Sequence, residues 1–474
     1  MKIKPLFTVV VFLFSVPSFA QHYQTDFPPE EFKARWQKVF DKIGDEAIAI
    51  VQGAPQVGGF NLPRQSNEFY YLCGIETPHS YLLLDGRIRE VTLFMPPRNK
   101  RLERSEGKIL SADTGPLVKQ LTGVDHVVST EAMTGKWLLD LTMEQRGPII
   151  YTPFSPAEGH AESRWELLQA RASAAADYWD GGLPRQARFI QLLKTRHHRA
   201  ELRDLTPTLD EMRSIKSERE VALIRRASQL AGLGMMAAIR STKAGIFEYQ
   251  LDASARYVFL VNGARLDAYR SITASGTQNI WNAHYFRNDK KLEDGDLILM
   301  DYAPDYRYYV SDIGRMWPVN GKFSKVQREL LQFVLDYRSA VMARIRPGVS
   351  ARQIQEEAKT AMEPVFARTE FSKTIYEKAA RKLVETGGGV FSHQVGMAVH
   401  DVGSYRQLLK PGHVFSVDPQ MWVPEENLYY RYEDTIVITE DGFENFTDFL
   451  PTELDDLERL ILEDGMVQQF PPSP

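Results

Sequence analysis

Hydrophobic residues in the first half of the chain follow two alternating patterns. Short β-branched runs at residues 46–51 and 90–95 have the composition of buried strands, and longer stretches between them have the spacing of amphipathic helices. This alternation over residues 27–196 predicts an N-terminal α/β domain. A polar, basic stretch at residues 194–199 and a proline at position 207 place the domain boundary near residues 194–210. His197 and His198 are adjacent in that stretch and do not converge on one ion, so a surface role is predicted.

The second half begins with a helix start signal and contains a faint internal repeat. Ser217 and Glu220 have the spacing of a capping box that opens a long helix. The pattern Leu-x-x-Gly-x5-Asp occurs twice and ends at Asp301 and at Asp418; each time a helix-ending Lys-Ala-Gly or Arg-Pro-Gly segment lies upstream. We therefore expect residues 210–450 to form two similar halves that bring both aspartates into one cleft, with residues 451–474 as a C-terminal helix and tail.

Two predicted hairpins each carry a pair of acidic residues. Strands at residues 297–301 and 308–312 flank a turn which, if centred on Tyr306 and Arg307, puts Asp301 opposite Asp312. Directly opposed side chains have Cβ atoms about 4.5–5.5 Å apart, and like charges there are destabilising. A cation between the two carboxylates would remove this repulsion.

The second hairpin repeats the arrangement. Strands at residues 414–418 and 429–433 flank a turn centred on Glu425 and Glu426, which puts Asp418 opposite Glu433. His393 offers a nitrogen ligand in the same half of the domain. Four carboxylates and one imidazole, without a thiolate, suit divalent ions such as Mn²⁺, Zn²⁺ or Co²⁺. Two ions about 3.5–4 Å apart would neutralise these charges and activate a shared water.

Composition and the first residues narrow the class of protein. The chain has 474 residues, 43% of them hydrophobic, and a net charge of −5, so it carries no basic footprint for nucleic acid. Residues 1–20 combine two lysines, a short apolar core and small residues at Ser18 and Ala20, which predicts a cleaved signal peptide. The apolar core is shorter than the roughly 20 residues of a membrane-spanning helix, so no stable membrane anchor is expected and the mature protein should be periplasmic or extracellular. Cys73 lies in an apolar stretch and is expected to be a small buried hydrophobe.

These motifs resemble those of the pita-bread metallopeptidases, in particular the aminopeptidase P and prolidase branch. The order and spacing of Asp301, Asp312, His393, Asp418 and Glu433 are similar to those of that family's five metal ligands. Ser311-Asp-Ile-Gly-Arg315, His400-Asp-Val-Gly403 and Arg431-Tyr-Glu-Asp434 look like motifs of this branch, and Arg64-Gln-Ser-Asn67 resembles the N-terminal domain of aminopeptidase P.

The resemblance implies an α/β (α+β) protein whose C-terminal pita-bread catalytic domain removes an N-terminal residue that precedes proline, through a hydroxide bridging two metal ions, most often Mn²⁺. It implies catalytic roles for four residues, His284, His400, Asp418 and Arg431. The sequence departs from the family at Asp418, where a Glu is usual, and at Gly389, where a His is common. Asp418 would then accept the water's proton in place of the Glu.

Several alternatives remain open. A prolidase would cut only Xaa-Pro dipeptides, and a non-catalytic protein could use the same fold to hold peptides. A creatinase-like, metal-free hydrolase is disfavoured because its chemistry does not require the ligand set kept here. Relatives of this kind often form dimers or tetramers, so a homo-oligomer is also expected by analogy.

Overall fold

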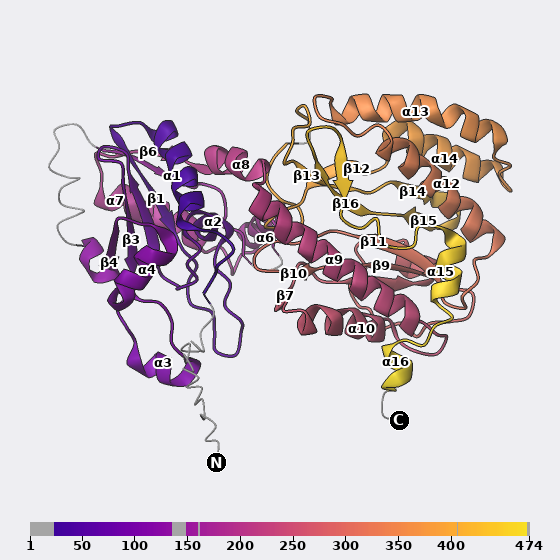
Figure 1. The fold of residues 1–474 in the computed structure, drawn as a ribbon, viewed down its shortest axis with the longest axis horizontal. Helices are drawn as coiled ribbons and strands as arrows, with labels where there is room; N and C mark the ends of the chain where they lie inside the picture. The colour runs from indigo at the N-terminus through magenta and orange to yellow at the C-terminus, as the bar shows by residue number, and fades with distance from the viewer. Residues whose placement is uncertain (1–22, 135–147, 160–161, 405, 472–474) are drawn as a thin grey trace, which may run out of the picture.

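The protein is described by a computed structural model that covers residues 23–134, 148–159, 162–404 and 406–471. The predicted signal peptide at residues 1–20 lies outside these described residues. The molecule consists of two bodies that lie side by side along its longest axis (Figure 1). The N-terminal body is drawn in indigo and purple, and the C-terminal body in red to yellow. Within the described ranges, no helix combines the length and apolarity needed to cross a bilayer.

The N-terminal body is built on a mixed sheet, as the α/β prediction requires. Its strand order is β4-β3-β2-β1-β5-β6, with β1–β2 and β2–β3 antiparallel and the other neighbours parallel. The predicted strand at residues 90–95 is confirmed, and that at 46–51 is confirmed with a shift of one residue. The strands are β1 (Ala47–Gln52), β2 (Tyr81–Asp85), β3 (Glu90–Met95), β4 (His126–Ser129), β5 (Ile149–Thr152) and β6 (Glu201–Asp204). The helices are α1 (Pro29–Ile43), α2 (Asn67–Cys73), α3 (Lys100–Glu106), α4 (Gly115–Thr122), α6 (Arg164–Ala176) and α7 (Arg185–Arg196).

The C-terminal body repeats one unit of two helices and three strands, which confirms the predicted duplication. The first unit is α9 (Glu218–Ser241), α10 (Glu248–Val261), β8 (Ile272–Ser275), β9 (Leu297–Asp301) and β11 (Gly314–Pro318). The second is α12 (Lys325–Met342), α13 (Ala351–Arg368), β12 (Val390–Gln394), β13 (Val414–Val417) and β16 (Asp434–Ile438). In Figure 1, α9 and α10 lie on one side of the strands and α12 and α13 on the other. A bridge between Gly314 and Glu433 joins the two sheets, β11-β9-β8 and β12-β13-β16-β17.

Helix α8 (Thr206–Ser214) connects the two bodies and packs against α1. Shorter elements complete the C-terminal body. They are α11 (Gly276–Ile280), α14 (Thr374–Thr386), α15 (Leu454–Leu460), α16 (Met466–Gln469), β7 (Leu266–Asp267), β10 (Pro304–Asp305), β14 (Gln420–Val423), β15 (Leu428–Arg431) and β17 (Phe443–Asn445). The capping box that opens α9 is confirmed: Glu220 N–H donates to the Ser217 hydroxyl, and Ser217 N–H donates to the Glu220 carboxylate.

The predicted register of the second hairpin is confirmed. Val417 pairs with Asp434 and Gln420 pairs with Arg431, so Asp418 and Glu433 lie opposite one another between these two pairs. Pro419 has no N–H to donate, and the ladder is interrupted there. Residues on both sides of the interruption nevertheless keep the same register.

The predicted register of the first hairpin is wrong by two residues. Asp301 pairs with Gly314, and the turn is centred on Arg307 and Tyr308, which have φ values of 54° and 74°. Two successive positive φ angles are those of a type I′ turn, and neither residue is the Gly or Asn that usually signals one. Asp312 therefore lies in the loop before β11 and not directly opposite Asp301. The loop nevertheless brings the Asp312 carboxylate to the other predicted ligands, since its Oδ2 lies 3.3 Å from His393 Nε2.

Two further predictions about single residues have opposite outcomes. Cys73 is fully buried and its thiol donates to the Phe69 carbonyl, which confirms its packing role. Burial raises the pKa of this thiol to about 12, so it is unreactive at neutral pH. His197 is buried at 4% exposure and not on the surface, because it follows α7 directly and tertiary packing covers it; His198 is exposed as predicted.

Candidate metal centre

The predicted ligands converge from both halves of the C-terminal body. Asp301 ends β9, His393 lies on β12, Asp418 follows β13, Glu433 lies between β15 and β16, and Asp312 precedes β11. One ligand atom each from Asp312, His393 and Glu433 lie within 4.8 Å of one another. His393 Nε2 is 3.3 Å from Asp312 Oδ2, and its Nδ1 lies 3.1 Å from the Gln394 carbonyl oxygen. Residues far apart in sequence thus form one compact set of donors.

Arg431 joins the remaining two carboxylates to this set. Its Nη1 lies 2.9 Å from Asp301 Oδ2, its Nε lies 3.0 Å from Asp418 Oδ1, and its Nη2 lies 2.9 Å from Asp418 Oδ2. The same Nη2 is 2.5 Å from Glu433 Oε2. The guanidinium is buried, so these contacts are ion pairs of the protein interior.

Burial and mutual repulsion dominate the electrostatics of the carboxylates. Burial raises the pKa of Asp301 to about 7, although Arg431 opposes the shift. Burial also raises the pKa values of Asp418 and Glu433. At Asp312 the effect of burial is outweighed by the hydrogen bond to His393, and the pKa falls to about 2. If all of these carboxylates were ionised, they would carry more negative charge than one guanidinium compensates, and three of them therefore favour the protonated form in the absence of a further cation.

Hydroxyl groups orient two of these carboxylates and hold the backbone of a third ligand, and none of these hydroxyl groups was predicted from the sequence. Tyr269 donates its hydroxyl to Asp301 Oδ1 at 2.6 Å, and Ser416 donates to Glu433 Oε1 at 2.6 Å. Asp312 is held through its backbone, which donates to the Thr435 hydroxyl at 3.0 Å. Ser416 lies two residues before Asp418 and so shares its face of the strand, which is a usable signal. Tyr269 follows β7, far from every motif, and no sequence signal marks it.

Asp418 and Gly389, the two positions at which the sequence departs from the family pattern, lie against one another. Gly389 has a φ of 93°, and a Cβ there would lie 2.7 Å from the Asp418 carbonyl oxygen and 3.0 Å from the Gln420 amide. The Gln420 amide donates to Asp418 Oδ2. A side chain at position 389 is therefore excluded by the backbone of Asp418, and Gln420 occupies the adjoining space and holds the short carboxylate.

Two histidines predicted to act on the substrate lie beside the cluster. The His400 ring packs edge-on against His393 with ring centroids 4.3 Å apart. Burial works to lower the pKa of His400, but the hydrogen bond to Glu166 outweighs it and raises this pKa. His284 lies beyond α11 and is exposed; partial burial and nearby Arg431 lower its pKa. His413 is fully buried and accepts a hydrogen bond from Lys410 N–H, so it packs apart from these groups.

The donor set fits divalent metal ions. Buried carboxylates and one imidazole are hard and borderline ligands, and their excess negative charge is what cations would compensate. Asp312, His393 and Glu433 would hold one ion. Asp301 and Asp418 could contribute to a neighbouring one, because Arg431 already brings them against Glu433.

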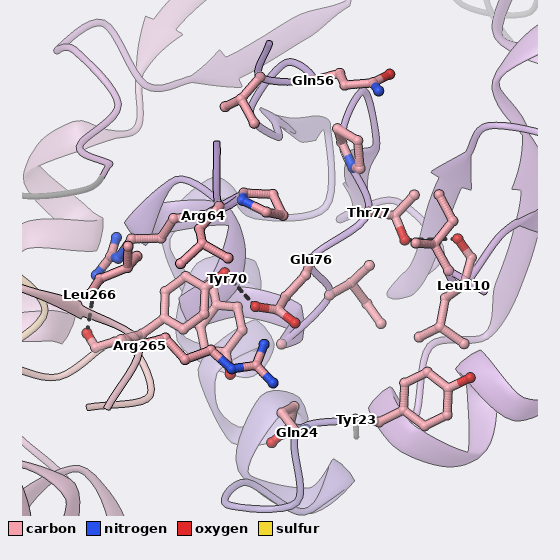
Figure 2. Close-up of a pocket in the computed structure, with 18 of the residues that line it drawn as sticks. Tyr23, Gln24, Gln56, Arg64, Tyr70, Glu76, Thr77, Leu110, Arg265 and Leu266 are labelled. Atoms are coloured by element: carbon pink, nitrogen blue, oxygen red, sulfur yellow. Dashed lines mark hydrogen bonds between the residues drawn. The ribbon is translucent and has the colours of Figure 1, made fainter. Parts of the chain in front are cut away.

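A separate cavity of about 390 Å³ lies at the junction of the two bodies. Figure 2 shows Arg64, Tyr70 and Glu76 on one side of it and Thr77 with Leu110 on another. Arg64 Nε contacts Asp305 Oδ2 at 2.6 Å, so the motif that begins at Arg64 joins the two bodies. None of the predicted metal ligands lines this cavity, and the chemistry described above lies elsewhere.

Two protein-family models match this chain, one in each of the two bodies. The model of metallopeptidase family M24 matches residues 222–440, and the model of the aminopeptidase P N-terminal domain matches residues 32–147. The chain is similar to a Xaa-Pro aminopeptidase of Haemophilus influenzae, with 29% identity over 93% of this chain and 99% of the relative. It is equally similar to a Xaa-Pro aminopeptidase of Escherichia coli, with 29% identity over 91% of this chain and 98% of the relative. The solved structure of proline aminopeptidase P II from Yersinia pestis superposes with a TM-score of 0.74 and 30% identity, over 92% of this chain and 99% of that one.

Proposed function

The chain belongs to metallopeptidase family M24, and we propose that it is a metal-dependent Xaa-Pro aminopeptidase, which hydrolyses the bond between an N-terminal residue and a following proline. The observation that carries the proposal is the convergence of Asp312, His393 and Glu433 within 4.8 Å, in a buried cluster that Arg431 extends to Asp301 and Asp418. Arg431 alone cannot compensate four buried acids if all are ionised, and divalent metal ions would supply the missing positive charge.

The proposed roles follow from the positions of the side chains. Asp301, Asp312, His393, Asp418 and Glu433 would hold two divalent ions, for which we propose Mn²⁺, with Zn²⁺ or Co²⁺ as alternatives. Such ions supply an activated water and polarise the scissile carbonyl. Arg431 would orient the carboxylates, since it already contacts three of them.

The remaining groups would handle the substrate and the proton. Asp418 would accept the proton of the attacking water at a carboxylate oxygen, the task of a general base. His400 would donate a hydrogen bond to the carbonyl oxygen as charge develops on it. His284, which is exposed at the edge of the cluster, would contact the substrate near its N-terminus.

A matched set of peptides tests the proposal. Purified protein supplied with Mn²⁺ is incubated with Xaa-Pro-Yaa, Xaa-Ala-Yaa and the dipeptide Xaa-Pro, and the released N-terminal residue is measured by chromatography. We expect release from Xaa-Pro-Yaa and much less from Xaa-Ala-Yaa. Cleavage of the dipeptide alone would instead identify a prolidase. Binding of Xaa-Pro-Yaa without cleavage, with Mn²⁺, Zn²⁺ and Co²⁺ tested in turn, would identify a peptide-holding protein.

We also propose that the protein is exported and that residues 1–20 are removed. The support is the sequence pattern alone: Lys2 and Lys4, a short apolar core, and small residues before Gln21. N-terminal sequencing of the protein recovered outside the cytoplasm should begin at Gln21. Recovery of a chain that begins at Met1 would contradict export by cleavage.

A further inference from the structure

One side chain of the N-terminal body reaches the candidate centre. Glu166 lies in the first turn of α6, and its Oε1 accepts a hydrogen bond from His400 Nδ1. Ser163, the N-cap of the same helix, accepts a second hydrogen bond from the His400 backbone N–H at 3.1 Å. The start of α6 thus holds both the backbone and the ring of a residue that lies more than two hundred positions later in the chain.

Ion pairs fix both sides of this contact, and those that Arg213 forms with Glu158 and Asp401 are fully buried. Arg164, two residues before Glu166, contacts Glu68 at 3.1 Å and Asp210 at 2.5 Å. On the other side, Asp401 contacts Arg213 Nη2 at 2.6 Å and Lys216 Nζ at 3.3 Å. The same Arg213 nitrogen lies 2.8 Å from Glu158, in the segment that leads into α6. Breaking one partner of such a buried pair is strongly destabilising, so the contact between Glu166 and His400 has little freedom to shift.

The hydrogen bond to Glu166 sets the orientation of the His400 ring and the position of its proton. The Glu166 carboxylate accepts from Nδ1–H and sets the plane of the ring. Nε2 is then the nitrogen left for a substrate, on a ring that already packs against His393. A carboxylate behind Nδ1 also stabilises the ring with both nitrogens protonated, which is the form that donates from Nε2 to the carbonyl oxygen. A free imidazole would sample other rotamers and both tautomers, and only some of these would be productive.

We propose that Glu166 is a positioning residue for His400, so that the N-terminal body contributes directly to the catalytic centre. This inference rests on the proposed function, because it assumes that His400 acts on the substrate. The hydrogen bond of the Glu166 side chain goes to His400 and not to a predicted metal ligand, so Glu166 would act through His400. A purely structural role, in which Glu166 only docks α6, would affect stability and leave the turnover of bound substrate unchanged.

Three variants in the full-length protein separate these roles. Glu166→Ala removes the acceptor, Glu166→Gln keeps an amide oxygen that can accept from Nδ1, and Gln169→Ala changes an exposed residue on the same helix. For Glu166→Ala we expect kcat on an Xaa-Pro-Yaa peptide to fall by about 10- to 100-fold, which is the usual effect of removing a residue that hydrogen-bonds and orients a functional histidine. We expect KM to change by less than about threefold. Glu166→Gln should recover most of the lost kcat, and Gln169→Ala should match the wild type.

A spectroscopic measurement gives a readout that does not depend on turnover. In ¹⁵N-histidine NMR spectra of the wild type, assigned with His400→Ala, the His400 signal should show a proton held on Nδ1. Glu166→Ala should shift this signal, and Glu166→Gln should leave the tautomer unchanged. A wild-type kcat in Glu166→Ala, or an identical His400 signal, would overturn the inference. A wild type that cleaves no peptide would overturn the proposed function instead, while the spectra would still test the contact.

Discussion

Replacement of Arg431 by methionine should strongly destabilise the metal-free protein. Methionine is similar in length and unbranched, so the change removes the charge and the hydrogen bonds while it keeps most of the volume. The guanidinium lies within 3.0 Å of Asp301, Asp418 and Glu433, and all of these groups are buried. Removing one partner of a buried ion pair costs about 3–5 kcal/mol, because the charge left behind has no compensation. Three orphaned carboxylates place the expected loss in the upper part of that range.

The assay is urea unfolding of chelator-treated protein, followed by tryptophan fluorescence. Arg225→Met is the matched control, because Arg225 forms a comparably close ion pair with Glu444, at 2.6 Å, but on a part of the surface where both side chains are more than a third exposed. Such a pair contributes about 0–1 kcal/mol. If Arg431→Met lost no more free energy of unfolding than Arg225→Met, the view of Arg431 as the internal counter-charge of the cluster would be refuted.

Further predictions concern the pH dependence, the base and the backbone of the same centre. The pKa of Asp301 is about 7 in the folded protein and about 4 when unfolded, so between these values the folded state holds a proton that the unfolded state has lost. Urea unfolding of metal-free protein should therefore show wild-type stability falling relative to Asp301→Asn as the pH rises from about 4 to about 7; a constant difference would contradict the shift. Asp418→Asn should lower the rate of Xaa-Pro-Yaa hydrolysis by at least about 10²-fold, whereas Asp418→Glu should retain or raise it, and equal rates in wild type and Asp418→Asn would show that another group takes the proton. Gly389→Ala should cost about 1–3 kcal/mol of unfolding free energy because of its positive φ and the nearby Asp418 carbonyl, whereas Gly442→Ala, with open space around it, should stay near the wild type; equal values would contradict this.

The elements that follow local rules could be predicted from the sequence. The capping box at Ser217 and Glu220 marked the start of α9, and Pro424 with Asn427 marked the turn that sets the register of Asp418 and Glu433. The first hairpin could not be predicted in the same way. Its turn places Arg307 and Tyr308 at positive φ, while Asp305 accepts from the Tyr308 N–H and binds Arg64 of the other body. Tertiary contacts therefore fix a turn for which the local residues give no signal.

The residues of the candidate site also fall into a predicted group and an unpredicted group. The five predicted ligands have motif spacing, and the structure brings Asp312, His393 and Glu433 together directly. Glu166 and Tyr269 reach this cluster only because distant segments pack against one another. The sequence places no motif around these two residues, and only the folded chain reveals their contacts. Gln420 lies two residues after Asp418, and its contact with that carboxylate is local.

Peptide hydrolysis should depend on bound metal if the five predicted ligands form the metal centre of a peptidase. Chelator-stripped protein is titrated with Mn²⁺ while bound metal per chain and release of the N-terminal residue from an Xaa-Pro-Yaa peptide are measured on the same samples. We predict no release from stripped protein, release that rises with bound Mn²⁺, and loss of both in Glu433→Ala. Undiminished release from stripped protein, or full metal binding in Glu433→Ala, would contradict the assignment of this cluster as the metal centre of a peptidase.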